Sequence, residues 1–285
     1  MTTDLSELNG WIPEPIEGPV LQKVLNTSAV EAAARRVPMS ARTARVPRFD
    51  AQGVDVVAEH ANIPLLDATV DDVEVVAQKF ANRFALSVED SRDAVANAID
   101  AFKLRWASNF AVKLDNAALG ATGGVFTQSV YEAATTNKQV TAGKLTLAQL
   151  AEAVSDLESG DYSDDLVVIA HPTFAMQLRQ MTDSNGFRVL QDPIAAGVPS
   201  IYGYDVHFTK GAVASTGASD RPTGNPLLIV GSKRNLILGV RDGVESALSD
   251  QAQWSTDNIE LKMRARRGFV VADGTAFRVI EKTAS

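Results

Sequence analysis

The sequence predicts an α+β protein in which a proline-rich leader and one long helix precede a body of alternating short strands and helices. Six of the eleven prolines lie within the first 64 residues. Residues 65–119 contain neither glycine nor proline, whereas glycines recur at short intervals from Gly120 onward, which is typical of frequent turns. A chain of 285 residues is long enough for about two domains.

The leader extends to about Arg45 and carries apolar residues, such as Trp11 and Val20, spaced among polar ones. Residues 30–36 can form about two helical turns, which Pro38 should end. A segment with this spacing cannot build a hydrophobic core of its own. We therefore expect an arm that lies on other surfaces, in preference to a disordered tail.

Two strands are predicted at 43–50 and 71–85, where apolar residues partly alternate with polar ones. About twenty residues separate them, so together they would form a long β-hairpin with an extended tip. Because a two-stranded hairpin is only marginally stable alone in water, this one needs a surface to lie on.

The clearest predicted element is a helix that ends before Gly120. Apolar residues recur three or four positions apart in a single stripe, and this stripe predicts a helix of about 29 residues. Ser87 or Ser91 can cap its start. The side chains expected in the core of this spine helix are Val95, Ile99, Phe102, Trp106, Phe110 and Leu114.

The remainder of the chain predicts a mixed body. A helix is expected at 147–157, a strand at 166–170, and a second helix that begins with Pro172 and extends to residue 181. Further strands are predicted at 205–209, 227–230, 236–240, 259–264 and 276–280.

No combination of residues typical of an enzyme occurs in the sequence, and we expect no catalytic residue, no cofactor and no metal. Cysteine is absent, which excludes disulfides, thiolate nucleophiles and cysteine metal sites. His60, His171 and His207 lie far apart, and none has a second histidine at metal-ligand spacing. We also expect no contact with a membrane, because no apolar run approaches the roughly 20 residues of a membrane span.

Basic residues gather in two places. Five arginines lie within residues 35–48 without an acid among them, and a second group would share one face of a strand. Guanidinium groups suit carboxylates across subunits as well as phosphates. Because the net charge is −8, we favour intersubunit ion pairs over lumen-facing contacts with nucleic acid, although the two roles are compatible. The candidates are Arg35, Arg36, Arg42, Arg45, Arg48, Lys262, Arg264, Arg266 and Arg267.

Taken in order, these segments resemble the major capsid proteins (major head proteins) of tailed bacteriophages, which have the Hong Kong 97-type (HK97-type) fold. The resemblance covers nearly the whole chain, and the order and spacing of the segments carry it. The matching segments are 11–15 (WIPEP), 45–48 (RVPR), 58–59 with 63–64, 79–91, 114–120, 185–187 (NGF), 201–206 (IYGYDV), 229–232 (IVGS), 264–271 and 275–277.

The resemblance implies a division of the chain into the parts of that fold. These are an N-terminal arm (1–45), an extended β-hairpin loop (46–86), a peripheral domain formed by the spine-helix region (87–128) and closing strands (241–285), and an axial domain (129–240).

The resemblance also implies a structural protein. Such a subunit self-assembles into pentamers and hexamers of an icosahedral head, which encloses double-stranded DNA without reading its sequence. The protein would be part of the virion shell, after assembly in the cytoplasm of a bacterial host.

Two departures from the family affect the expected partners. Some members join subunits covalently through a loop lysine and an asparagine, but no lysine lies between Val46 and Gln78. We therefore expect packing, ion pairs and a separate cementing protein to hold the shell. The chain starts shortly before the arm, so the scaffold, like the portal, is expected to be a separate protein.

An encapsulin-like nanocompartment shell, which shares the fold and encloses a cargo enzyme, is the alternative function. The proline-rich arm favours the phage, because encapsulin-like shells usually begin with a helix that receives the cargo peptide. A cytosolic α/β enzyme with an unrecognised site is a third interpretation, and a convergent polar pocket in the monomer would distinguish it.

Overall fold

The computed structural model describes residues 27–49, 54–63, 65, 70–87, 98–160, 162, 165–183, 186–191 and 197–283. The chain forms two compact units. The described residues of unit 1 are 81–87, 98–108 and 244–265, and those of unit 2 lie within 27–80, 109–243 and 266–283.

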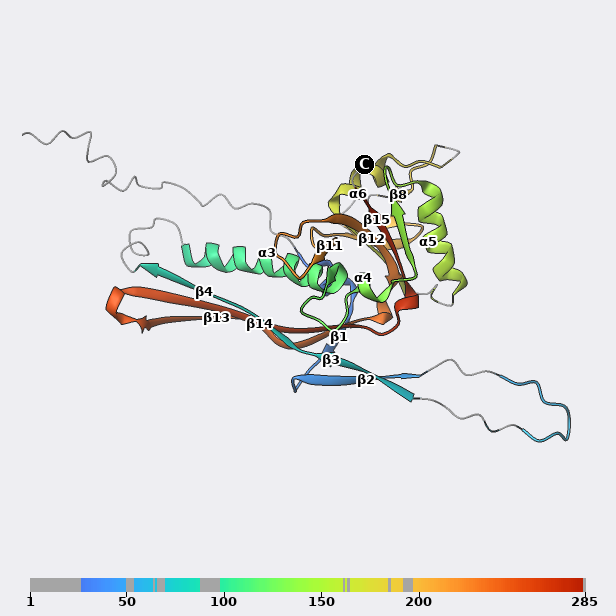
Figure 1. Cartoon of the computed structure of the whole chain (residues 1–285), viewed down its shortest axis with the longest axis horizontal. Helices are drawn as coiled ribbons and strands as arrows, with labels where there is room; N and C mark the ends of the chain where they lie inside the picture. Colours follow the sequence, from blue (N-terminus) through green and yellow to red (C-terminus); the bar gives the residue numbers. More distant parts are fainter. Residues whose placement is uncertain are drawn as a thin grey trace, which may run out of the picture. The chain divides into compact units, whose positions relative to one another are not determined.

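Unit 2 contains a nine-stranded mixed sheet that includes β12 and β15 (Figure 1), and β7 and β12 are central in its strand order. β7 reads Leu-Val-Val-Ile-Ala and is buried along its whole length, as expected of a strand that is covered on both faces. It pairs antiparallel with β12 and parallel with β10, and β12 pairs antiparallel with β15. The strands are β5 (Ala121–Thr122), β6 (Lys138–Thr141), β7 (Leu166–Ala170), β8 (Leu190–Gln191), β9 (Ser200–Ile201), β10 (Tyr204–Phe208), β11 (Val213–Thr216), β12 (Asn225–Ser232) and β15 (Phe277–Lys282).

Two capped helices pack on this sheet. α5 (Leu147–Ser159) begins with a capping box between Thr146 and Gln149, and α6 (Pro172–Gln180) has its proline in the first turn, as predicted. Their apolar faces belong to the same core cluster as β7 and β12. The short helix α4 (Val130–Ala133) has its own capping box.

The long helix α3 (Ala98–Leu119) ends where the sequence predicts, while the region expected to start it, including Val95, lies outside the described residues. The next residue is Gly120, and only glycine fits there because a Cβ would collide with the carbonyl of Val213. The backbone of Gly120 is not left-handed. None of the described helices is long and apolar enough to cross a membrane.

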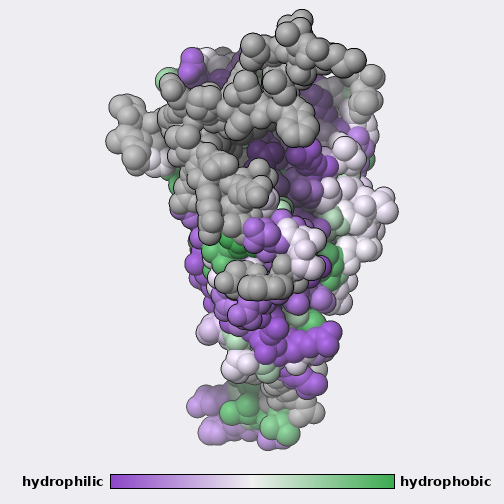
Figure 2. Space-filling view, turned by 90° about the vertical axis from the view of Figure 1, so that its left-hand side faces the viewer, coloured by the Kyte–Doolittle hydropathy of each residue, from purple (hydrophilic) through white to green (hydrophobic). Residues whose placement is uncertain are grey.

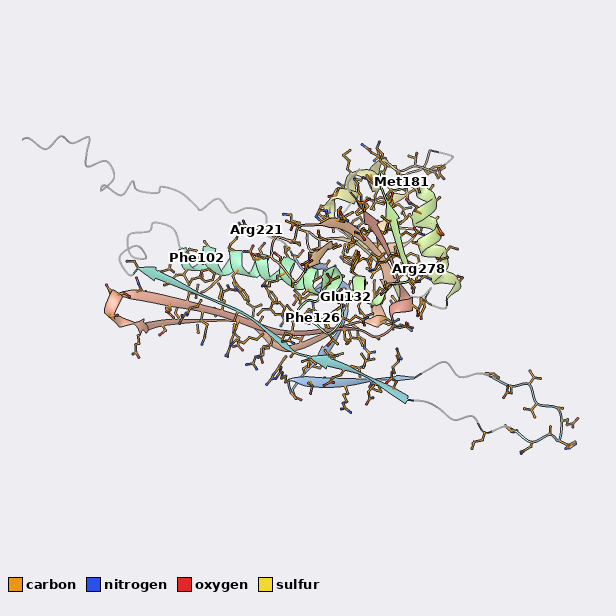
Figure 3. All side chains as sticks on the ribbon, viewed as in Figure 1. Phe102, Phe126, Glu132, Met181, Arg221 and Arg278 are labelled. Carbon is orange, nitrogen blue, oxygen red and sulfur yellow. The ribbon has the colours of Figure 1, made fainter. Side chains whose placement is uncertain are left out.

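The apolar stripe of α3 is only partly buried. Trp106, Phe110 and Leu114 are buried and Ile99 is half-buried. Phe102 is 38% exposed, although its ring lies 5.7 Å from that of Phe84 (Figure 3). The expectation that Phe102 is a core residue is therefore wrong for the described part of the subunit, in which the ring of Phe84 is the one aromatic ring that packs against it.

A four-stranded sheet in the order β1-β13-β14-β4 contains the two longest strands. β13 (Leu236–Gln253) and β14 (Asn258–Val271) begin near the strands predicted at 236–240 and 259–264 but extend much further. The prediction stopped early because charged residues interrupt the apolar pattern of both strands. The other members are β1 (Arg35–Pro38) and β4 (Gln78–Ser87).

The predicted helix at 30–36 is wrong in its end. α1 (Ala29–Ala33) stops before Arg35, and Pro38 belongs to β1, which pairs in parallel with β13. Proline is tolerated there because β1 is an edge strand of the sheet. Short 3-10 turns complete the connections: η3 (Lys233–Asn235), η4 (Trp254–Thr256) and η5 (Gly274–Ala276).

The predicted hairpin exists, with one change. β2 (Thr43–Phe49) pairs antiparallel with β3 (Val70–Val76), and the segment between them includes a long loop (Figure 1). The single strand predicted at 71–85 is instead two strands. β3 pairs with β2 and ends before Ala77, and the chain then continues as β4, which belongs to the four-stranded sheet.

We predict that Trp106→Ala lowers the free energy of unfolding by about 3–5 kcal/mol. The indole ring is 6% exposed, and its Nε1 donates a hydrogen bond to Asn82 Oδ1 at 3.1 Å. Urea unfolding followed by circular dichroism measures the loss. Phe102→Ala, in the same helix but more exposed, is the control and should cost less; equal losses would contradict the difference in burial.

Candidate assembly surfaces

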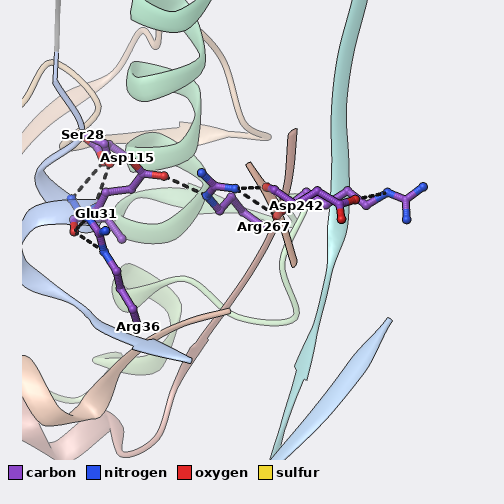
Figure 4. A network of polar contacts seen from close by, with 8 residues as sticks. Ser28, Glu31, Arg36, Asp115, Asp242 and Arg267 are labelled. Carbon is purple, nitrogen blue, oxygen red and sulfur yellow. Dashed lines mark hydrogen bonds and ion pairs between the residues drawn. The ribbon is translucent and has the colours of Figure 1, made fainter. Parts of the chain in front are cut away.

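A buried carboxylate holds the first described residues of unit 2 to the helix α3 (Figure 4). Asp115 is 0% exposed and accepts hydrogen bonds from Ser28 Oγ at 2.6 Å and from the backbone nitrogens of Ala29 and Val30 at 2.9 and 3.1 Å. Thr209 Oγ1 donates a fourth at 2.5 Å. The start of α1 is thus attached to the helix and to the end of β10.

Burial raises the pKa of Asp115 to about 6, while the hydrogen bonds from Ser28 and Thr209 act in the opposite direction. The desolvation of a carboxylate is costly, and hydrogen bonds to the ionised form reduce that cost. Asp115 is therefore charged at neutral pH only because four donors surround it.

The side chain of Arg267 is buried in the interior of unit 2. It is 7% exposed, its Nε donates to Glu31 Oε1 at 2.8 Å, and its guanidinium lies 5.8 Å from the ring centroid of Phe110. A second nitrogen donates to the carbonyl of Asp242 (Figure 4). The sequence predicts that Arg267, like Arg266, faces a neighbouring subunit or the lumen. Arg267 is instead buried, because its side chain points to Glu31.

The arginines of the first basic cluster, residues 35–48, have different partners. Arg36 donates to the carbonyl of Glu31 at 2.8 and 3.2 Å, and Arg45 makes a long, exposed ion pair with Asp72 at 3.9 Å. Arg35 and Arg42 have no ion pair among the described residues.

Arg48 fastens the β2–β3 hairpin. It donates to the carbonyl of Ala272 at 2.7 Å and pairs with Asp71 on β3 at 3.0 Å. Burial alone would raise the pKa of Asp273, but hydrogen bonds from Thr275 and Tyr162 hold this pKa below its ordinary value, and the positive charge of Arg48 adds to the lowering.

The basic residues of β14 alternate with buried ones, as their spacing predicts. Lys262 is exposed, and Arg264 and Arg266 are half-buried. Arg264 pairs with Glu245 at 2.7 Å and Arg266 with Asp242 at 3.3 Å, while Lys262 has no ion pair in the part of the chain that the structure describes.

The base of the hairpin is seated on a small core in unit 2. Met39, Val75, Ala77, Ile237 and Val270 are buried together there. Two glycines permit this approach. A Cβ at Gly239 would meet Met39 and Val75, and one at Gly268 would lie 2.7 Å from Val75 Cγ1 and 3.0 Å from the carbonyl oxygen of Val76.

Beyond this seat, the loop of the hairpin is exposed. Val54, Val56, Ile63 and Leu65 are between 79% and 102% exposed. The loop contains a turn that is closed by the 3.0 Å hydrogen bond from Ala61 N to the carbonyl of Ala58, and Glu59 lies in this turn. Apolar side chains this exposed in a connected segment indicate a surface that binds a partner.

No group of three or more histidine or acidic residues in the described ranges could hold a metal ion. Sequence reasoning missed the contacts of Asp115, Glu31 and Thr209. One signal was available, because an acid near the C-terminus of a helix opposes the helix dipole and so calls for strong partners.

We predict that Asp115 makes stability depend on pH between about 4 and 6. Its folded pKa of about 6 exceeds the ordinary value of 3.8, so its contribution is greatest below pH 3.8 and is lost as the pH rises through 6. The difference corresponds to about 3 kcal/mol. Urea unfolding from pH 4 to 7 should show that the free energy of unfolding falls in wild type and not in Asp115→Asn. The prediction is wrong if the free energies of the two proteins change with pH in parallel.

We predict that Gly268→Ala destabilises unit 2 by about 1–3 kcal/mol, because the added methyl group meets Val75 and the backbone of Val76. Thermal unfolding measures the loss, and limited proteolysis should show faster cleavage of the hairpin. Gly243→Ala is the matched control, since a Cβ there meets no atom within 4 Å. An unchanged melting temperature for Gly268→Ala would exclude the proposed close approach.

The sequence matches the phage capsid family over residues 9–282. No curated protein matches it. Among solved structures, the chain is similar to one of Mycobacterium phage Bobi, with a TM-score of 0.76, 20% identity and coverage of 100% of both chains. It is also similar to a chain of Mycobacterium phage Adephagia, with a TM-score of 0.70, 16% identity and coverage of 100% of this chain and 99% of that one.

A third similar structure is the capsid of an empty GTA particle, with a TM-score of 0.69, 16% identity and coverage of 99% of this chain and 98% of that one. At these identities the likeness establishes the fold, which is of the HK97 type. The family match spans almost the entire sequence, so the chain belongs to the phage capsid family: it is a major capsid protein of a tailed phage or GTA, a structural and non-enzymatic subunit of an icosahedral virion shell.

Proposed function

We propose that this subunit closes the head as pentamers and hexamers in which the extended hairpin of each copy lies on a neighbour. The observation that carries the proposal is the exposure of Val54, Val56, Ile63 and Leu65, because an apolar loop of this kind is stabilised when a partner covers it. The hairpin base, by contrast, is held by Arg48 and the core around Val75.

Polar contacts would supply much of the remaining interface. Hydrophilic residues cover most of the described surface on the face shown in Figure 2, and the apolar patches there are small and separate. Arg35 and Lys262 are exposed and make no ion pair with the residues that the structure describes, so they are suited to carboxylates of neighbouring copies.

The proposed division of the chain remains an arm (1–45), an extended loop (46–86), a peripheral domain (87–128 and 241–285) and an axial domain (129–240). Ala29, Val30 and Ala33 are buried within unit 2. Contacts of the arm with a neighbouring copy would therefore not involve these three residues.

The proposed content of the shell is double-stranded DNA held without sequence-specific contacts. A net charge of −8 supports this proposal, since each phosphate neutralised by a cation adds affinity that a container does not need. Separate scaffolding, portal and cementing proteins complete the proposed set of partners, and assembly is proposed to occur in the cytoplasm of the bacterial host.

Expression of the chain alone tests the proposal. We expect size-exclusion chromatography and negative-stain electron microscopy to show closed particles or capsomers at high protein concentration. A variant in which residues 54–63 are replaced by a glycine–serine linker should keep the melting temperature and lose the particles. If the wild-type chain alone stays monomeric, the same comparison is made with the proposed scaffolding protein present. A linker variant that assembles normally would overturn the proposed role of the hairpin.

The contents of the particles distinguish phage from encapsulin-like shells. Nuclease-protected DNA supports the head, whereas a co-purified enzyme would support the alternative.

A further inference from the structure

A basic hollow lies beside the seat of the hairpin in unit 2. It is an open depression of about 260 Å³, lined by Arg42, Ala77, Gln78, Lys79, Arg241 and Arg266. Three parts of the chain meet there: the turn before β2, the junction of β3 and β4, and the adjacent strands β13 and β14. The hydrogen bond from Ala77 N to the carbonyl of Arg42, 2.8 Å long, joins the first two parts.

The charge of this hollow is largely uncompensated. Among the described residues, Arg42, Lys79 and Arg241 make no ion pair, and only Arg266 has a carboxylate partner, Asp242 at 3.3 Å. No acidic side chain lines the hollow. Cations brought together in this way repel one another in the isolated subunit, so an anion that enters the hollow is stabilised by all of them.

We propose that this basic hollow binds Asp55 and Glu59 in the hairpin loop of a second copy of the chain. The proposal rests on the proposed function. It adds which surface of the neighbouring copy binds the loop and which charged side chains make this contact specific. The hollow and the loop would then form one heterologous contact, which repeats from copy to copy around a capsomer.

The loop has the chemistry that the hollow requires. Residues 54–63 contain two acids, Asp55 and Glu59, and neither lysine nor arginine. The Glu59 side chain is 92% exposed, and its described ion-pair partner is the equally exposed His60 at 3.8 Å. Val54 and Val56 flank Asp55 and are exposed, so they would contact Ala77, the one apolar residue that lines the hollow, when the acid reaches the arginines.

The observations favour a protein carboxylate over nucleic acid. The chain carries 35 acidic and 27 basic residues, so a neighbouring copy is a ready source of carboxylates. Guanidinium groups bind carboxylates in a bidentate geometry, which gives such a contact a defined register. Three arginines line the hollow.

The first test reverses the charge of the hollow. We expect Arg42→Glu/Arg241→Glu to raise the concentration needed for assembly by more than about tenfold, with an unchanged melting temperature of the subunit. Light scattering and electron microscopy measure assembly. Lys144→Glu/Lys210→Glu makes the same change of charge at exposed positions outside the hollow and should assemble like wild type.

The second test exchanges the charges of the hollow and the loop, so that an acidic hollow faces a basic loop. Asp55→Arg/Glu59→Arg alone should also fail to assemble, and the chain that carries all four substitutions in the hollow and the loop should recover closed particles. This recovery excludes misfolding as the cause of the first loss.

Each other outcome overturns the inference. Normal particles from Arg42→Glu/Arg241→Glu would show that the hollow takes no part in assembly. Lost assembly without recovery in the fourfold variant would exclude Asp55 and Glu59 as the occupants, and normal particles that lose only their DNA would assign the hollow to phosphates. Failure of wild type to assemble, even with the proposed scaffolding protein present, would instead overturn the proposed function itself.

Discussion

The fold of unit 2 depends on a carboxylate that has been taken out of water. Asp115 is held at a cost in desolvation, and the four hydrogen bonds that offset this cost come from the start of α1 and from Thr209. The contact therefore decides where the first described residues lie. Ser28 and the start of α1 are thereby fixed against α3 and the end of β10.

A second constraint is the absence of side chains at Gly239 and Gly268. The hairpin can lie against β13 and β14 only because no Cβ occupies the space filled by Met39 and Val75. Arg48 then ties β2 to Ala272. The base of the hairpin is thus part of a packed core, while the described residues of its loop are exposed.

Much of this organisation could be predicted from local pattern. The apolar run at 166–170 and the proline at the start of α6 gave correct elements, because both signals are local in the sequence. The division at Ala77 and the strand at Pro38 could not be predicted, since each depends on pairing with a distant segment.

The same distinction applies to the candidate surfaces. The spacing of Lys262, Arg264 and Arg266 predicted an exposed face of β14, but the burial of Arg267 depends on Glu31, which lies 236 positions earlier. The basic hollow was equally hidden, because Arg42, Lys79 and Arg241 come together only when three parts of the chain meet. Periodicity identifies a face, whereas tertiary contact decides which of its charges are paired.

The position of β15 in the chain makes the large sheet of unit 2 depend on an order of synthesis. β12, at the centre of this sheet, is paired on one side by β7 and on the other by β15, which begins 45 positions after β12 ends. Arg267, which joins Glu31 to Asp242, lies within that interval. A ribosome that adds about 5–20 residues per second therefore completes β15 some seconds after β12. During that time β12 has no β15 to pair with, so the sheet cannot be completed before β15 has been translated.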